Sequence, residues 1–251
     1  MGKKQTKRDL RSDLLLIAAL IAWAFFVNRQ FRISGLYKDD LYTWSCWGEQ
    51  SFLQYAFPLD STRCRFVYWT LSWLELGLIG GHLEWIVPIN ILLNAGPASF
   101  LYYFAKRLSG SRTVAFLVGA LFLGSHFAYY QIGQLLGLME TLGVFFALLQ
   151  AYFLYRYLSG KSEGRDFLLA LLAYFLNCFT HERYMVLLPM FFYCLLVRRD
   201  KKWQRYLLAA GVFLLVQGIR LLMIGTVSPE GTGGTSLKDT FTLQSAITNF
   251  G

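Results

Sequence analysis

Charged side chains are scarce in this sequence: only 16% of its 251 residues are Asp, Glu, Lys or Arg. A typical soluble domain carries about 25%. The deficit excludes an ordinary water-soluble protein and, with 55% hydrophobic residues, indicates lipid as the solvent. The net charge of +9 does not indicate nucleic-acid binding, because the basic residues recur between apolar runs and form no single patch.

Cysteine is also rare, with four residues and no CxxC or Cys/His cluster, so the sequence predicts no structural metal site. Cys46 and Cys64 are expected in one external loop, where they either form a disulfide or remain free thiols. Cys178 and Cys194 fall within apolar runs. The basic opening segment precedes an apolar run with no small-residue cleavage site after Val27, and therefore predicts an uncleaved first helix.

Seven apolar runs predict an all-α polytopic membrane protein with about seven transmembrane helices. The runs are Leu14–Val27, Trp85–Ala105, Thr113–Tyr129, Leu138–Tyr155, Phe167–Phe179, Met185–Val197 and Tyr206–Ile224. Phe167–Phe179 and Met185–Val197 are short, and form either two thin spans or a re-entrant hairpin. Aromatic residues make up 18% of the chain, which suits a protein with many membrane–water boundaries.

The distribution of Lys and Arg predicts a cytoplasmic N-terminus in a plasma (inner) membrane. Four short segments hold most of the basic residues: Lys3, Lys4, Lys7, Arg8 and Arg11; Lys106, Arg107 and Arg112; Arg156, Lys161 and Arg165; Arg198, Arg199, Lys201, Lys202 and Arg205. This topology places a long first external loop at about residues 28–84. Within it, Phe66–Gly80 is predicted as an interfacial helix, because a span there would move every later basic cluster outside.

We expect two parts, a transmembrane module over residues 1–225 and an external loop or tail over residues 226–251. The tail is rich in Gly, Thr and Ser and has no closing helix. We interpret it as the start of a further C-terminal part.

Asp39 and Asp40 are adjacent carboxylates directly after the first run. Their mutual repulsion favours a proton, a cation or a polar substrate at this position. One of them could act as a general base toward a hydroxyl group. The alternative is a solvated acidic turn.

His181, Glu182 and Arg183 separate the two short apolar runs. Ionisable groups at this depth are costly, and usually face a cavity or one another. The three residues are therefore candidates for substrate binding. The alternative is a Glu182–Arg183 pair that neutralises itself.

Three more arginines are candidate phosphate ligands. Arg220 lies near the outer end of the last apolar run, and Arg63 and Arg65 precede the predicted interfacial helix. Each could hold a phosphate with its guanidinium group or extend to the membrane interface.

A polar group surrounds the external turn between the third and fourth runs, and its hydrogen-bonding side chains suit a sugar. Glu140 stands out within it, because it opens an otherwise apolar helix. The group comprises His126, Tyr129, Tyr130, Gln131, Gln134 and Glu140.

The chain resembles the N-terminal module of the GT-C glycosyltransferases, a superfamily that includes the protein O-mannosyltransferases and the aminoarabinose transferase of lipid A. The likeness covers residues 10–225. It rests on the acidic pair after the first span, the Arg-led loop helix RCRFVYWTLSWLELGLIGG, the segment from IVPINILLNAGPAS to FLGSH, and FLNCFTHERYMVLLP. These enzymes use a polyprenyl- or dolichyl-phosphate sugar donor.

The resemblance implies transfer of a sugar from a polyprenyl-phosphate donor to a hydroxyl of a glycan, lipid or protein acceptor at the external face. Asp39 would be the general base, and Asp40 would orient Asp39 or bind the acceptor. Arg220 and Arg65 would stabilise the leaving phosphate. Glu182, together with its histidine neighbour, would line the same cavity. Nucleic acid is not an expected partner.

The sequence departs from the family pattern at two points. The second acid is Asp where several relatives have Glu. The second external loop has no Asp-x-Asp motif, which weakens the case for a divalent cation, although the resemblance allows metal-assisted transfer. No other cofactor is indicated.

The rival hypothesis is a non-catalytic protein, either a lipid-linked glycan transporter or a scaffold subunit of a polysaccharide assembly complex. Transporters typically carry ionisable residues in mid-membrane and often show inverted repeats. Here the candidate residues gather toward the external face and no repeat is evident. The sequence therefore favours the transferase.

Overall fold

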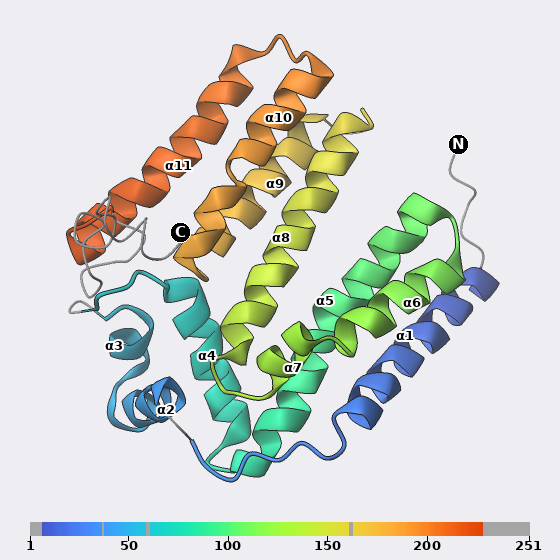
Figure 1. Ribbon diagram of the computed structural model, residues 1–251. Helices are drawn as coiled ribbons and strands as arrows, with labels where there is room; N and C mark the ends of the chain where they lie inside the picture. Colours follow the sequence, from blue (N-terminus) through green and yellow to red (C-terminus); the bar gives the residue numbers. More distant parts are fainter. Residues whose placement is uncertain (1–6, 37, 59–60, 161–162, 228–251) are drawn as a thin grey trace, which may run out of the picture.

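The computed structural model describes residues 7–36, 38–58, 61–160 and 163–227, and these residues form helices and no strands (Figure 1). This confirms the predicted all-α class. In chain order the helices are α1 (Lys7–Val27), α2 (Asp39–Glu49), α3 (Phe52–Ala56), α4 (Phe66–Ile79), η1 (Leu83–Trp85), α5 (Ile86–Ser109), α6 (Arg112–Leu123), α7 (His126–Ile132), α8 (Gly137–Leu158), α9 (Glu163–Cys178), η2 (Glu182–Leu187), α10 (Pro189–Arg198) and α11 (Trp203–Ile224).

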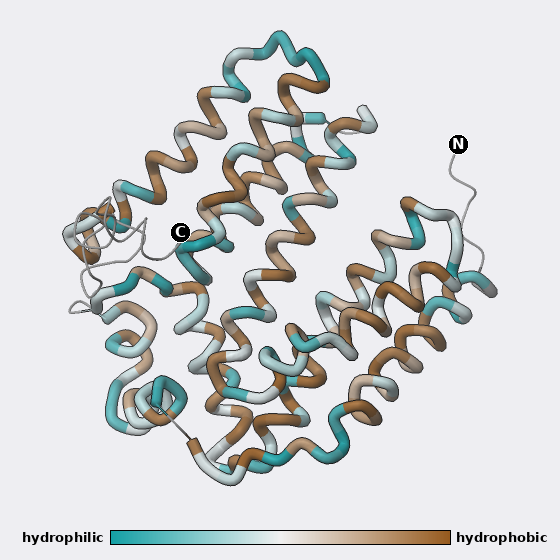
Figure 2. The backbone as a smooth tube through the Cα atoms, viewed as in Figure 1, coloured by the Kyte–Doolittle hydropathy of each residue, from teal (hydrophilic) through white to brown (hydrophobic). Residues whose placement is uncertain are grey.

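Within the described residues, four helices are long and apolar enough to cross a membrane, and α6 with α7 makes a fifth candidate that is bent by 58°. The four stretches are Asp9–Val27, Leu83–Ser109, Gly137–Leu158 and Trp203–Ile224. Apolar residues follow these helices along much of their length (Figure 2). Leu222 of α11 is 87% exposed, whereas the polar Asn94 and Gln150 are fully buried. Apolar side chains outside and polar ones inside are typical of a helical membrane protein.

The long helices pack into two bundles with separate cores. Leu20, Ile91 and Ala115 belong to the core formed by α1, α5, α6 and α7. Phe167 and Phe191 belong to the core of α8, α9, α10 and α11. Helix α4 contacts α3, α5 and α8, so the helices of the first loop lie across the junction between the bundles.

Local signals explain where several helices begin and end. Ser51 and Gln54 form a capping box that starts α3, and Ser125 accepts a hydrogen bond from the backbone of Ala128 at the start of α7. Helix α4 ends at Gly80, whose φ of 59° favours glycine. The segment predicted as a long external loop is thus largely helical, with α2, α3 and α4 inside it.

The basic segments gather at one end of the molecule, opposite α2, α3 and α4 (Figure 1). Carboxylates from neighbouring helices neutralise many of them. Asp13 of α1 accepts hydrogen bonds from Tyr102 at 2.9 Å, Lys106 at 2.5 Å and Arg112 at 3.1 Å. These contacts tie α1 to α5 and α6. Lys3 and Lys4, like Lys161 and the predicted tail after residue 227, lie outside the described residues.

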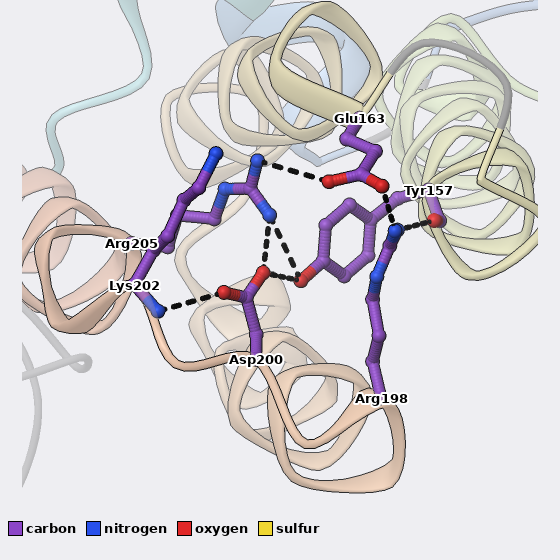
Figure 3. A network of polar contacts seen from close by, with 6 residues as sticks. All are labelled: Tyr157, Glu163, Arg198, Asp200, Lys202 and Arg205. Atoms are coloured by element: carbon purple, nitrogen blue, oxygen red, sulfur yellow. Dashed lines mark hydrogen bonds and ion pairs between the residues drawn. The ribbon is translucent and has the colours of Figure 1, made fainter.

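A second network at this end joins α8, α9, α10 and α11 (Figure 3). The Tyr157 hydroxyl donates to Asp200 at 2.5 Å, and Arg205 pairs with Asp200. Arg198 pairs with Glu163. Each long helix that begins or ends here therefore has charged contacts with its neighbours.

Candidate functional site

Seven of the candidate residues form one group at the end of the molecule that holds α4. We call this group the Arg–Glu cluster. It consists of Arg63, Arg65, Glu140, His181, Glu182, Arg183 and Arg220.

Glu182 is the centre of the Arg–Glu cluster. Arg65 donates two hydrogen bonds to it, from Nε to Oε2 and from Nη2 to Oε1, both at 2.7 Å. Arg63 Nη1 lies 3.2 Å from Oε1, and His181 Nδ1 lies 3.7 Å from Oε2. The Glu182 side chain is only 4% exposed. The buried Glu182 carboxylate thus holds the Arg65 guanidinium group by two hydrogen bonds and that of Arg63 by one contact.

Backbone contacts between distant segments bring these residues together. The Phe179 carbonyl, directly after α9, accepts hydrogen bonds from the amides of Val67 at 3.2 Å and Tyr68 at 3.4 Å. These two amides belong to the first turn of α4, where the helix itself supplies no acceptor. Arg65, directly before α4, therefore lies next to Glu182, the first residue of η2.

Arg220 of α11 also belongs to the cluster. It is 1% exposed and lies within electrostatic range of Glu182, Arg63 and Cys64. The Cys64 thiol, between the two loop arginines, contacts the Met223 sulfur at 3.5 Å. The outer end of α11 therefore packs against the segment that leads into α4.

The first turns of α8 close the other side of the cluster. Glu140 is 5% exposed and forms an ion pair with Arg183. At the residue directly before it, the Met139 sulfur lies 3.4 Å from Arg65 Nη1. The predicted alternative, in which Glu182 and Arg183 neutralise each other, is not what the structure shows, because each pairs with a different partner.

Gly143 of α8 packs directly against the ring of Tyr184, beside the cluster. A Cβ at this position would lie 2.2 Å from the nearest ring carbon of Tyr184. The Gly143 carbonyl also accepts a hydrogen bond from Asn177 at 3.1 Å. A residue without a side chain therefore allows α8 to pack closely against η2.

The cluster has an excess of positive charge. Burial alone would raise the pKa of Glu182, but hydrogen bonds from Arg65 and its positive charge outweigh burial and lower it. Burial and the two neighbouring arginines lower the pKa of His181 to about 4, so the imidazole is neutral at pH 7. Four arginines against two glutamates leave two positive charges. A net positive charge of this kind suits a negatively charged ligand.

The ligand set of a metal ion is not found among the described residues of this site. In the described residues, no group of three or more His, Cys, Asp and Glu side chains could hold a metal ion.

The two adjacent aspartates differ in their surroundings. Asp40 accepts hydrogen bonds from the amides of Leu135 at 3.1 Å and Leu136 at 2.9 Å, immediately before α8. Burial, followed by the repulsion of Asp39, acts to raise the pKa of Asp40 and outweighs these two amide contacts. Asp39 is exposed in the first turn of α2. Asp40 thus holds the start of α8, while Asp39 faces outward.

His126 lies apart from the Arg–Glu cluster. It is exposed at the start of α7, where its ring stacks on Tyr129. No interaction among the described residues joins it to the cluster. Gln131, from the same predicted polar group, accepts a hydrogen bond from Asn94 at 3.0 Å inside the first bundle. The group is therefore divided, and only Glu140 belongs to the cluster.

The cysteines are free thiols. Cys46 is partly exposed on α2, and Cys64 is fully buried against Met223. The sequence left open whether Cys46 and Cys64 form a disulfide or remain free thiols, and in the structure both are free.

Glu75 of α4 is an ionisable residue that sequence reasoning did not select. It is 3% exposed, and lies within electrostatic range of Asp40. The available signal was a single carboxylate in the apolar run FVYWTLSWLELGLIG. A buried ionisable residue in such a run usually serves a function.

Comparison with protein-family models, with curated proteins and with solved structures finds no match for this chain.

Proposed function

We propose that this chain is a membrane glycosyltransferase that moves a sugar from a polyprenyl-phosphate donor to an acceptor hydroxyl at the external membrane face. The observation that carries the proposal is the Arg–Glu cluster, with its two excess positive charges, at the end of the molecule opposite the basic segments. The resemblance to the GT-C glycosyltransferases supports the same function.

The cluster suits a lipid phosphate because the charge on that phosphate grows during transfer. The donor is a phosphodiester with one negative charge, and the departing lipid phosphate carries up to two. Arg63 and Arg65 are held in place by Glu182, and Arg220 is buried beside them. Prearranged cations at a site poor in water stabilise such developing charge. These arginines would bind the donor and favour departure of the phosphate.

Asp39 is the better candidate for the general base, since Asp40 already binds the two amides before α8. In this mechanism the acceptor hydroxyl gives its proton to the Asp39 carboxylate. The acceptor oxygen forms a bond to the anomeric carbon as the bond from that carbon to the phosphate oxygen breaks. The sugar is transferred with inversion, and the lipid phosphate leaves with the electron pair.

The topology that accompanies this function has about seven spans and a cytoplasmic N-terminus in the plasma (inner) membrane. The apolar helices α1, α5, α8 and α11, with the bent α6–α7 pair, support it. Helix α9 and the η2–α10 segment would complete the count as a pair that enters and leaves. Residues 28–84 would then lie outside the membrane.

Donor binding and transfer can be measured separately in lipid nanodiscs. Binding uses radiolabelled polyprenyl phosphate, and transfer uses a panel of labelled polyprenyl-phosphate sugars with membrane extracts as acceptor. We expect Arg220→Gln to lose donor binding, and Asp39→Asn to retain binding but lose transfer. The exposed Arg199 supplies the control, and Arg199→Gln should change neither measurement.

Two results would contradict the proposal. If polyprenyl phosphate does not bind the wild-type protein, the cluster is not a lipid-phosphate site. If it binds without transfer of any sugar in the panel, a transporter or scaffold is favoured instead.

A further inference from the structure

The carboxyl group of Glu75 lies inside the protein at the interface between α4 and its neighbours. Its side chain is on the same face of α4 as Tyr68, Ser72 and Leu76, all of which are buried. Neither of its oxygens has a hydrogen-bond partner among the described residues. An ionised carboxylate in this position would lose its hydration without a compensating contact.

The titratable groups around Glu75 are acids. Asp40 of α2 is the charged group that acts on it. Tyr55 of α3, whose hydroxyl bonds Ser72 at 2.9 Å, and Tyr68 of α4 are also within electrostatic range, and Cys46 of α2 acts on Tyr55. None of these groups supplies a positive charge. Burial, followed by the repulsion of Asp40, raises the pKa of Glu75 to about 8.

The carboxyl groups of Asp40 and Glu75 differ in the hydrogen bonds that could stabilise their ionised forms. Asp40 accepts two backbone hydrogen bonds at the start of α8, which favour its ionised form. Glu75 has no such contact. Because Asp40 repels a negative charge on Glu75, the proton is held by Glu75 while Asp40 carries the charge.

We propose that Glu75 is a proton-holding positioning residue: its neutral carboxyl group allows Asp40 to remain ionised and to hold the first turn of α8. That turn leads directly to Met139 and Glu140, which contact Arg65 and Arg183 of the Arg–Glu cluster. The proton on Glu75 thus stabilises the geometry of the cluster, whose role as a donor site rests on the proposed function.

Loss of the proton from Glu75 should destabilise the folded protein. Glu75 would then carry a buried negative charge that the charge of Asp40 repels, and α4 or α2 must move away from α8 to hydrate one of the two carboxylates. The folded protein binds this proton more tightly than the unfolded chain, in which the pKa of Glu75 is about 4.5. Stability from this group is therefore complete below about pH 4.5, declines as pH rises, and is lost by about pH 8.

Infrared spectroscopy of the protein in nanodiscs tests the protonation state directly, because a protonated carboxylic acid has its own C=O stretching band. We expect the wild-type protein to show this band at about pH 6 and to lose it by about pH 9.5. Glu75→Gln should abolish the band, whereas Glu84→Gln, on an exposed carboxylate in the same loop, should leave it unchanged.

Two further measurements connect the proton to Asp40 and to the fold. Asp40→Asn removes the neighbouring negative charge, so the band should disappear at a lower pH than in the wild type. The unfolding temperature, followed by tryptophan fluorescence, should fall between about pH 6 and about pH 8 in the wild type and stay constant in Glu75→Gln.

The proposal is overturned if the wild-type band is absent at about pH 6, or if Glu75→Gln leaves it unchanged. It is also overturned if the midpoint for loss of the band is the same in Asp40→Asn as in the wild type. The spectra use no sugar donor, so their outcome is independent of whether the protein proves to be a transferase.

Discussion

Replacing Glu182 with Gln should lower the free energy of unfolding by about 3 kcal/mol. The substitution keeps the size of the side chain but removes the negative charge that Arg65 and Arg63 share. Removing one partner of a buried ion pair typically costs about 3–5 kcal/mol, because the other charge remains without compensation. The side chains of Arg65 and Arg63 are 17% and 33% exposed, so partial hydration places the cost at the lower end of this range.

A thiol-reactive dye provides a suitable assay, since Cys64, Cys178 and Cys194 are buried and become reactive only on unfolding. For a chain of this size, 1 kcal/mol corresponds to about 2–4 °C, so we expect the midpoint to fall by about 6–12 °C. Glu49→Gln, on an exposed carboxylate of α2, is the control and should leave the midpoint unchanged.

A double-mutant cycle tests whether the cost of Glu182→Gln comes from the uncompensated charge of Arg65. Arg65→Met alone should also destabilise the protein, but combining it with Glu182→Gln should cost less than the sum of the two single changes, because the buried charge is then removed with its partner. Additive effects, or a Glu182→Gln midpoint within about 2 °C of the wild type, would refute the reasoning.

Three further predictions concern packing, pH and topology. Gly143→Ala should destabilise the protein by about 1–3 kcal/mol and weaken polyprenyl-phosphate binding, because its Cβ would lie 2.2 Å from a tyrosine ring; Gly211→Ala, with open space around it, should do neither. Burial acts to raise the pKa of Asp200, but hydrogen bonds and a neighbouring arginine hold it at about 2, so Asp200→Asn should lower the unfolding temperature at pH 7 and have little effect near pH 2. A membrane-impermeant thiol reagent should label Cys46 in intact cells and Lys202→Cys only after permeabilisation; labelling of both in intact cells would contradict the proposed topology.

The helical class and the separation of the two ends were predictable because hydropathy and charge act locally along the chain. An apolar run long enough to span lipid becomes a helix whatever its neighbours are. The basic residues in the first turns of α1, in the last turn of α5 and directly before α11 therefore mark one end without knowledge of any contact. The predicted helix at Phe66–Gly80 corresponds to α4, because its pattern needed only its own residues.

The pairing within the candidate site could not be read from the sequence. Arg65 and Glu182 are 117 positions apart, and their contact depends on how α4 packs against the turn after α9. The neighbouring Glu182 and Arg183 looked like a pair, but Glu182 pairs with Arg65 and Arg183 pairs with Glu140. His126 was grouped with Glu140 by closeness in the chain, and the different directions of α7 and α8 separate them.

Asp40 shows how an incomplete prediction arises. Its carboxylate was assigned to chemistry, but it binds the amides of Leu135 and Leu136, 95 and 96 positions away. A helix start needs acceptors for its first amides, and a distant residue can supply them. Nothing in the sequence around Asp40 indicates this partner.

The long sequence separation between α4 and its partners has a consequence for biosynthesis. At about 5–20 residues per second, roughly 6–23 seconds pass between synthesis of Arg65 and synthesis of Glu182. During that interval α1, α5 and α6 can already assemble through their own contacts, while the arginines before α4 still lack their carboxylate. The first bundle is therefore expected to mature early in the ribosome-bound chain. Helix α4 docks late, when the turn after α9 has emerged. During this interval quality-control factors would meet an incomplete protein.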